Sequence, residues 1–286
     1  MAAAPVRSVS PAAMATEFQM TDADFAAIAA KASRYTGIVL GEHKRSMVYS
    51  RIARRLRATG LGNFRDYLAY LEANPDSEME NFINAITTNL TSFFREPHHF
   101  KFLEEELLPK LKRTNANSRR IRIWSAGSSI GQEAYSIAIC VLRAKFPKDW
   151  DVRILATDLD SSVLETGRNA VYPIDHLDPV EDELRHKYFR ISPDGRKITL
   201  IPEVKSLVSF KRLNLLEPWP MKGPFDLIFC RNVVIYFNKD TQRVLFDRYA
   251  DMLPPEGHLF IGHSENLAGV CDRFQNLGQT IYRKIR

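Results

Sequence analysis

Residues 121–146 read IRIWSAGSSIGQEAYSIAICVLRAKF, and residues 152–160 read VRILATDLD. The first stretch has the pattern of a short buried strand, a turn of small residues and an apolar helix. The second has the pattern of another buried strand that ends in acidic residues. Strands and helices that alternate at these lengths are typical of a parallel sheet covered by helices. These residues therefore predict an α/β fold.

The same alternation continues towards the C-terminus. A buried strand is predicted within 225–237, an amphipathic helix over 239–253 and a further strand within 257–264. Residues 279–285 (QTIYRKI) have the pattern of a last strand. Because only a loop separates this strand from the one before it, we expect it to run antiparallel.

Residues 172–213 interrupt this rhythm. They contain two segments with the pattern of short strands, ISPDGRKITLI and KSLVSFKRLN. Pro193, Asp194 and Gly195 form a hairpin turn signal within the first segment. We therefore predict a small antiparallel β subdomain at about 172–213, inserted into the larger domain.

The N-terminal part of the chain shows helical periodicity and no strand pattern. Thr21 and Asp24 have the spacing of a capping box, and apolar residues follow at helical spacing as far as Gly37. Further helices are predicted over about 42–59, 64–72 and 77–89. We expect an all-helical domain at 21–90, followed by the α/β domain at 91–286.

Composition excludes several classes of protein. Residues 1–20 are rich in Ala, Ser and Pro and lack the apolar core of a secretion signal, which predicts a disordered tail. No apolar run reaches the roughly 18 residues of a membrane span. The cysteines, Cys140, Cys230 and Cys271, are far apart and show no CxxC spacing. We therefore expect a reducing compartment, the cytoplasm, with neither a disulfide framework nor a metal site.

Two features at the ends of the predicted strands suit a cofactor that contains adenosine. The small residues around Gly127 let a ligand approach the backbone closely, although an ordinary strand-to-helix turn would look the same. Asp158, at the end of the next strand, can accept hydrogen bonds from both ribose hydroxyls, or can act as a helix cap.

Glu133, in the first turn of the helix after Gly127, bears on the class of cofactor. A dinucleotide would place its pyrophosphate at this helix N-terminus, where a carboxylate would repel it. S-adenosylmethionine has no phosphate and carries an ammonium and a sulfonium group, so Glu133 suits it. The other interpretation is that Glu133 only complements the helix dipole.

Residues 89–96 (NLTSFFRE) combine polar, aromatic and basic side chains between the two predicted domains. Asn89, Thr91 and Arg95 alternate with apolar residues, so they could form the polar wall of a cleft. The alternative is a linker in which Arg95 pairs with Glu96 or with a nearby acid.

A second group of candidates follows the strand within 225–237. Asn232 and Tyr236 fall where parallel strands present their ligand contacts, although Tyr236 could also be a packed aromatic residue. The Asn/Asp-Pro-Pro-Tyr motif of many amino-group methyltransferases is absent. That absence argues against a base nitrogen as the methyl acceptor.

Taken together, six sequence blocks resemble the CheR family of chemotaxis receptor methyltransferases. They are TTNLTSFFRE at 87–96, WSAGSSIGQEAYSIAI at 124–139, ATDLD at 156–160, LNLLEPW at 213–219, GPFDLIFCRNVVIYF at 223–237 and LFIGHSEN at 259–266. The resemblance covers about residues 20–286. It implies a class I S-adenosylmethionine-dependent methyltransferase with a Rossmann-like sheet, an N-terminal all-helical domain and an inserted β subdomain.

The activity that the resemblance implies is methyl transfer from S-adenosylmethionine to glutamate carboxylates of bacterial chemoreceptors, which supports adaptation in chemotaxis. S-adenosylhomocysteine is the implied product. Such a carboxylate is already ionised at neutral pH and needs no strong general base. This agrees with the lack of a convincing Ser/His/Asp or Cys/His arrangement. His98-His99 and His263-Ser264-Glu265 are interpreted as structural.

The resemblance also implies roles for single residues. Implied cofactor contacts come from the linker, the strand ends and the loops after them: Asn89, Thr91, Arg95, Glu133, Asp158, Asn214, Leu215, Cys230, Arg231 and Asn232. Arg95 and Tyr236 match residues thought to assist catalysis. Where the family often reads Gly-Glu-Glu-Pro-Tyr-Ser, this chain reads Gly-Gln-Glu-Ala-Tyr-Ser at 131–136, which keeps the second acid.

The predicted β subdomain looks a few residues shorter than in family members that dock onto a receptor's C-terminal peptide. We therefore expect no C-terminal peptide tether. We also expect a monomer that does not insert into a membrane.

Residues 42–59 predict a helix with an apolar side and a basic side. Basic residues fall largely on one side: Lys44, Arg51, Arg54, Arg55 and Arg57. Such a face is often only solvated, but beside an active site it would steer an acidic substrate helix. Because receptor methylation helices are rich in Glu, the resemblance favours a receptor-binding surface.

Two other classes of function stay open. A class I methyltransferase that acts on RNA would use the basic helix to bind phosphates, and a net charge of +6 is compatible with that. The missing motif and the whole-chain resemblance argue against nucleic acid. A receptor-binding module with a decayed active site is the other alternative, and the presence of Arg95, Glu133, Asp158 and Tyr236 argues against it.

Overall fold

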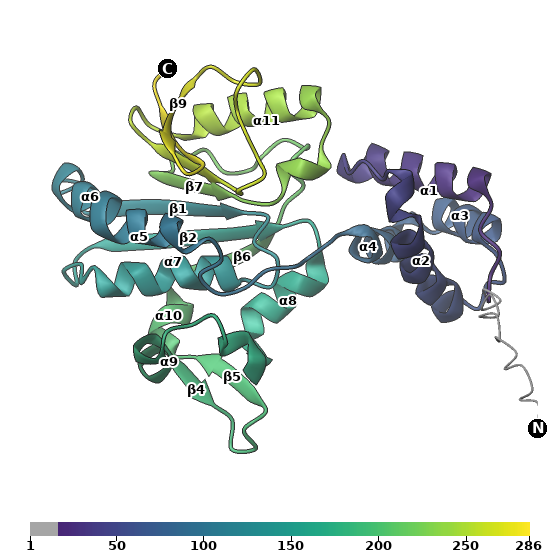
Figure 1. Cartoon of the computed structure of the whole chain (residues 1–286), viewed down its shortest axis with the longest axis horizontal. Coiled ribbons are helices and arrows are strands. Elements are labelled where there is room, and N and C mark those ends of the chain that lie inside the picture. The colour runs from purple at the N-terminus through teal and green to yellow at the C-terminus, as the bar shows by residue number, and fades with distance from the viewer. Residues whose placement is uncertain (1–16) are drawn as a thin grey trace, which may run out of the picture.

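The computed structural model describes residues 17–286 (Figure 1). The predicted disordered tail therefore lies mostly outside the described residues. For residues 17–20 the prediction of disorder is wrong, because these residues pack on the helical domain. The Phe18 ring lies 6.5 Å from that of Phe64, and the Phe18 N–H donates to the Tyr49 hydroxyl at 3.2 Å. Within 17–286, no helix combines the length and apolarity needed to cross a membrane.

The first part of the chain is all helical, as predicted. It contains α1 (Asp22–Thr36), η1 (Glu42–Lys44), α2 (Arg45–Thr59), α3 (Phe64–Ala73) and α4 (Pro75–Ile86). The capping box is present, since the Thr21 hydroxyl accepts from the Asp24 N–H, and Gly37 closes α1 in the left-handed conformation. The last helix ends at Ile86, earlier than the predicted Asn89, so the residues that follow are free to act as a linker.

The helical domain has its own core. Apolar residues of all four α-helices bury one another there, including Ile28, Ile52, Tyr67 and Phe82. The predicted apolar side of α2 is confirmed, because Val48, Ile52 and Leu56 are fully buried.

The remaining residues build the α/β domain around a seven-stranded sheet with the order β6-β2-β1-β7-β8-β10-β9. The strands are β1 (Arg120–Ala126), β2 (Asp151–Asp158), β6 (Val208–Arg212), β7 (Leu227–Cys230), β8 (His258–Ile261), β9 (Phe274–Gly278) and β10 (Ile281–Lys284). Strands β6, β2, β1, β7 and β8 are parallel. Strand β10 runs antiparallel to β8, as predicted, and β9 is an additional edge strand.

Helices cover both faces of this sheet (Figure 1). Ahead of β1 lie α5 (Pro97–Phe102), the π-helical segment η2 (Leu103–Leu107) and α6 (Leu108–Thr114); α7 (Gln132–Arg143), α8 (Ser161–Asn169) and α11 (Lys239–Met252) follow. Because side chains alternate along a strand, β1 sends Ile121 and Ile123 into the core under α7, and Trp124 into the core under α11. The C-terminal ends of the parallel strands thereby meet at one edge, facing the helical domain.

The inserted subdomain is smaller than predicted. Its sheet has the order β3-β5-β4, formed by β3 (Val171–Pro173), β4 (Phe189–Ile191) and β5 (Lys197–Leu200), and is antiparallel throughout. The short helices η3 (Ile174–Leu177), α9 (Asp182–Tyr188) and α10 (Pro202–Ser206) accompany it. The segment KSLVSFKRLN, assigned to the subdomain from sequence, instead supplies β6, which pairs with β2 in the main sheet.

Candidate active site between the two domains

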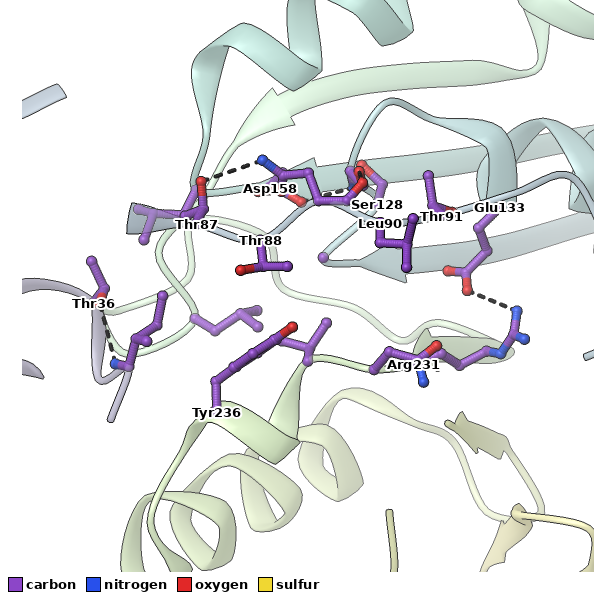
Figure 2. A pocket seen from close by; sticks show the side chains of 18 of the residues that line it. Thr36, Thr87, Thr88, Leu90, Thr91, Ser128, Glu133, Asp158, Arg231 and Tyr236 are labelled. Carbon is purple, nitrogen blue, oxygen red and sulfur yellow. Dashed lines mark hydrogen bonds and ion pairs between the residues drawn. The ribbon is translucent and has the colours of Figure 1, made fainter. Parts of the chain in front are cut away.

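A cleft lies where the helical domain, the linker and the strand ends meet (Figure 2). It encloses about 950 Å³, part of it open solvent. Most of the residues singled out from the sequence line it: Asn89, Thr91, Arg95, Gly127, Glu133, Asp158, Asn214, Leu215, Arg231, Asn232 and Tyr236. Thr36 and Ile38 come from the helical domain, so the cleft is shared by both parts of the chain.

The turn after β1 approaches the opposite wall very closely. Gly127 has φ 81°, and a Cβ atom there would lie 2.3 Å from Cγ2 of Val233. The N–H groups of Gly127 and Ser128 both donate to the Thr157 carbonyl, at 2.8 and 2.9 Å. The turn is therefore fixed to the end of β2, and only glycine fits at its first position.

Asp158 lies at the end of β2 and borders the cleft. Its carboxylate accepts hydrogen bonds from the N–H groups of Ser129, at 2.8 Å, and Asp160, at 3.0 Å. Burial raises the pKa of Asp158 to about 6, although these N–H groups oppose the shift. Each oxygen keeps a lone pair for a ligand, so the fold orients an acceptor suited to a pair of ribose hydroxyls.

Glu133 lies in the first turn of α7 and belongs to a buried ion-pair chain. It accepts a hydrogen bond from the Ser125 hydroxyl at 2.7 Å and pairs with Nη1 of Arg231 at 3.0 Å. Burial raises the pKa of the Glu133 carboxyl, and Arg231 opposes this shift. Glu133 thus contributes negative charge to the cleft wall, as a cationic cofactor requires, and its second oxygen is already shared with Arg231.

Arg231 also ties the linker to the sheet. Its Nη2 donates to the Arg95 carbonyl and lies 3.3 Å from Oε2 of Glu96. Burial alone would raise the pKa of Glu96, but Arg231 and the His263 N–H hold it below its ordinary value. Arg95 does not pair with Glu96; its own Nη1 donates to the Leu90 carbonyl at 2.9 Å. The sequence did not indicate this chain of contacts, because its members are remote along the chain.

Tyr236 stands on the wall opposite the linker, and its hydroxyl points into the cleft (Figure 2). Its backbone carbonyl accepts from the Val39 N–H at 2.9 Å, and Nζ of Lys44 lies 4.7 Å from the ring centroid. A loop from the α/β domain and the start of the basic segment, residues 42–59, are thus held together at the mouth of the cleft.

Glu265 is a buried residue that fixes the backbone of this wall. Its carboxylate accepts hydrogen bonds from five backbone N–H groups, those of Asn232, Val233, Val234, Ile235 and Gly262. Asn232 takes a left-handed conformation with φ 59°, which the buried carboxylate helps to maintain. These contacts support the structural interpretation of Glu265, which holds the loop that precedes Tyr236.

Asp160 is a second residue whose role was not foreseen. Its carboxylate caps α8 and accepts from the Thr87 hydroxyl and the Asn89 side-chain amide, both at 2.7 Å. The motif Asp160-Ser161-Ser162 carries a capping signal, but nothing in it identifies the linker as the other partner. The Asn89 amide N–H₂ is thus engaged with Asp160, which leaves the amide oxygen for a ligand.

Cys230 is the predicted cofactor residue that does not line the cleft. It is fully buried, and its thiol accepts a hydrogen bond from the Tyr249 hydroxyl at 3.1 Å. Strand alternation turns its side chain into the core under α11, away from the cleft. A cofactor contact from Cys230, as the resemblance implies, would therefore have to come from its backbone.

Three of the five basic residues predicted to form a receptor-binding face have partners within the helical domain. Arg55 makes a bidentate pair with the buried Glu78, with both contacts at 2.8 Å. Arg51 donates to the last carbonyls of α4, including that of Ile86 at 3.0 Å, and Arg57 pairs with Glu17. Arg54 is exposed and has no ion pair with any residue of 17–286.

Glu96, His98 and His99 bring three potential metal-ligand atoms within 4.8 Å of one another. The guanidinium of Arg231 lies 3.3 Å from Oε2 of Glu96 and would repel a cation at that carboxylate. Burial and Arg231 lower the pKa of His99 to about 3, and its Nε2 lies 2.9 Å from the Gln279 carbonyl. These contacts support the structural interpretation of the His98-His99 pair.

An open, mostly parallel sheet with a glycine turn after β1 and an acid at the end of β2 suits a cofactor that contains adenosine. Glu133, in the first turn of the next helix, disfavours a pyrophosphate there and indicates the class of S-adenosylmethionine-dependent methyltransferases. Comparison with known families is more specific. Residues 89–283 match the CheR methyltransferase SAM-binding domain, and residues 23–87 match the CheR methyltransferase all-alpha domain. The chain therefore belongs to the CheR methyltransferase family, and its cofactor is S-adenosylmethionine.

Individual relatives match along nearly their whole length. The chain is 42% identical over 281 residues to chemotaxis protein methyltransferase 2 of Pseudomonas aeruginosa, covering 97% of this chain and 99% of the relative. It is 42% identical to the chemotaxis protein methyltransferase of Salmonella typhimurium, covering 94% and 92%. The Escherichia coli chemotaxis protein methyltransferase is 40% identical, covering 94% and 93%.

Proposed function

We propose that this protein transfers the methyl group of S-adenosylmethionine to glutamate side chains of bacterial chemoreceptors in the cytoplasm. The observation that carries the proposal is the shared cleft, which is lined by the acidic residues Glu133 and Asp158 of the α/β domain and has Lys44 of the helical domain over Tyr236 at its mouth. The family and the relatives' names support a methyltransferase in chemotaxis. Glutamate as the acceptor is supported by two cations at the cleft, since Arg95 lines it and Lys44 lies over the Tyr236 ring.

The cofactor is proposed to lie along the strand ends. Asp158 would accept hydrogen bonds from the ribose hydroxyls, and Glu133 would face the cationic amino acid end. The Gly127 turn would pass beneath the cofactor, while Asn214, Leu215 and Asn232 would enclose it from the loops. Asn89 and Thr91 would close it from the linker. These roles fit because each residue lines the same cleft.

When bound, S-adenosylmethionine would supply a methyl group on a sulfonium to a carboxylate oxygen, with S-adenosylhomocysteine as the leaving product. The protein's part is to orient and desolvate the carboxylate. We assign Arg95, on the linker, to hold the carboxylate, and Tyr236, on the opposite wall, to orient it. No proton has to be removed from an ionised glutamate at neutral pH.

Recognition of the receptor is proposed to use the basic segment at the cleft mouth. Lys44 and Arg54 are the members best placed to meet an acidic helix, because Lys44 stands over Tyr236 and Arg54 is exposed. Arg51, Arg55 and Arg57 would add to the positive field while they also hold the helical domain together. The protein is proposed to act as a monomer.

The β subdomain is proposed to work without a C-terminal receptor peptide. Supporting this, its strands are only three or four residues long, and β6 belongs to the main sheet instead. Calorimetric titration with such a peptide is expected to give no heat of binding. Micromolar binding would show that the subdomain is a docking site after all.

The test of the main proposal uses methyl-labelled S-adenosylmethionine and membranes that contain chemoreceptors. Base-labile label is expected in the receptor band, with at least a tenfold loss in Arg95→Ala, since a positioning interaction is removed. Arg113→Ala is the matched control, because Arg113 is exposed on α6 and does not line the cleft. Label in RNA, or none in any receptor tried, would contradict the proposal.

A further inference from the structure

The mouth of the cleft carries a set of exposed apolar side chains, which we call the apolar rim. Its members are Leu90, Val39, Ile235, Leu216 and Tyr35, with exposed fractions of 82%, 48%, 47%, 37% and 37%. Apolar groups of this size that gather at one place mark an interaction site more often than scattered ones do. Other large exposed apolar residues, such as Val244 and Leu277, lie away from the cleft residues.

We infer that the apolar rim is a docking surface for apolar residues of the substrate helix, so that the methylated glutamate must have apolar neighbours on its own helix face. This inference rests on the proposed function and deepens it. It predicts a substrate rule that charge attraction alone does not impose.

The rim surrounds the site where the acceptor must enter. Leu90 lines the cleft itself. Each other member is next in sequence to a lining residue: Tyr35 to Thr36, Val39 to Ile38, Leu216 to Leu215 and Ile235 to Tyr236. The rim therefore draws on the helical domain, the linker and two loops of the α/β domain. Figure 2 shows Leu90 on the wall across from Tyr236.

Backbone contacts hold the rim in place before any partner binds. The Val39 N–H donates to the Tyr236 carbonyl at 2.9 Å, and the Asn214 amide donates to the Tyr35 carbonyl at 3.0 Å. The Ile235 N–H donates to Glu265 at 3.3 Å. Leu216 packs over Gly37, where a Cβ atom would lie 2.6 Å from its Cδ1. A preformed apolar surface loses little entropy on binding.

Charge beside the rim selects among possible partners. Lys44 lies over the Tyr236 ring, and the exposed Arg54 follows on α2, so an acidic partner is favoured. RNA would pair its phosphates with the cations but would leave the apolar side chains exposed to solvent. An amphipathic acidic helix would pair with the cations and would also bury the apolar rim. Residues three or four positions from a glutamate lie about 5–6 Å from it on the same face. A helix whose glutamate enters the cleft therefore brings those positions onto the rim.

The first test changes the rim. Val39→Ser and Ile235→Ser are each expected to raise the KM for receptor roughly fivefold, because part of an aliphatic side chain is no longer buried on docking. The dissociation constant for S-adenosylhomocysteine and the melting temperature are expected to stay unchanged, which excludes misfolding. Leu277→Ser is the matched control, since Leu277 is 40% exposed on the edge strand β9.

The second test changes the substrate. In a receptor fragment, an apolar residue four positions from a methylated glutamate is replaced by serine, and in a control fragment the residue two positions away is replaced. The first change is expected to raise KM and the second to leave it unchanged. Equal effects from both, or unchanged KM in both rim variants, would overturn the inference. If the wild type methylates no receptor at all, it is the proposed function that fails.

Discussion

At the scale of single residues, the role proposed for Asp158 predicts that cofactor affinity depends on pH. Its pKa is raised to about 6, so the carboxylate is ionised above that pH and protonated below it. Ribose hydroxyls donate best to the ionised form. We expect the affinity for S-adenosylhomocysteine, measured by calorimetry, to fall as the pH is lowered through about 6 and to be constant above about 7.

Asp158→Asn provides the control for this effect. The amide keeps an acceptor oxygen but does not titrate, so the variant is expected to bind more weakly at neutral pH and to lose the dependence near pH 6. Persistence of the same pH profile in Asp158→Asn would assign it to another group. Glu133 would then be the first candidate, since burial raises its pKa as well.

Gly127 supports a prediction about shape. In Gly127→Ala, the new methyl group would meet Val233 in a backbone conformation that L-residues avoid, at a cost of roughly 1–2 kcal/mol for the conformation alone. We expect a lower melting temperature and loss of cofactor binding. Adding Val233→Ala is expected to recover the steric part of the loss only. Full recovery would show that the conformation is not strained.

The residues that line the candidate cofactor site could be predicted where the chemistry is local. Glu133 and Asp158 stand at fixed offsets from a strand end, and the structure places both in the cleft. Arg231 could not be understood in the same way, because its partners Glu96 and Glu133 are brought to it only by folding. Residue type alone did not show that the Cys230 side chain faces the core.

At the scale of elements, α2 carries two adjacent arginines with different roles. Arg55 is bound to Glu78, whose side chain is 4% exposed, whereas Arg54 faces solvent. Arg55→Ala leaves a buried carboxylate without its partner and is expected to cost on the order of 3 kcal/mol of unfolding free energy. Arg54→Ala is expected to leave stability unchanged and to raise the KM for receptor.

Thermal unfolding and receptor methylation, measured on both variants, separate these effects. A stable Arg55→Ala protein with a raised KM would place Arg55 on the receptor-binding surface instead. The helical pattern of residues 42–59 correctly predicted an apolar side of α2, where Val48, Ile52 and Leu56 are buried. It could not distinguish Arg54 from Arg55, because Glu78 comes from another helix.

Strand β6 shows a similar limit. Its sequence indicated a strand, but strand patterns do not specify which neighbour a strand pairs with. The position of β6 beside β2 depends on Phe210, which fills the space beside Gly131 and Gly167. Cβ atoms at these two glycines would lie within 2.7 Å of the Phe210 ring. These glycines leave room for β6 to join the edge of the main sheet. The two helix boundaries at Gly37 and Gly60 were predictable, since each glycine takes the left-handed conformation.

At the scale of the whole molecule, Asp160 joins the two domains. Asp160→Ala removes the cap of α8 and the acceptor for Thr87 and Asn89 together. We expect a loss of about 2 kcal/mol of unfolding free energy, and a loss of cofactor affinity that exceeds what the cap alone explains. Asp182→Ala is the comparison, because Asp182 is an exposed residue in the first turn of α9. Equal cofactor affinity in the two variants would show that the linker does not need Asp160.

Within residues 17–286 the chain passes from the helical domain to the α/β domain once, through the linker (Figure 1). That crossing is also a wall of the cleft. A ligand that contacts both the linker and the strand ends binds where these are packed together, so it stabilises that arrangement by about 2.7 kcal/mol at a concentration one hundred times its dissociation constant. We therefore expect S-adenosylmethionine to protect the linker from proteolysis, so that the rate of cleavage at the linker reports how much cofactor is bound.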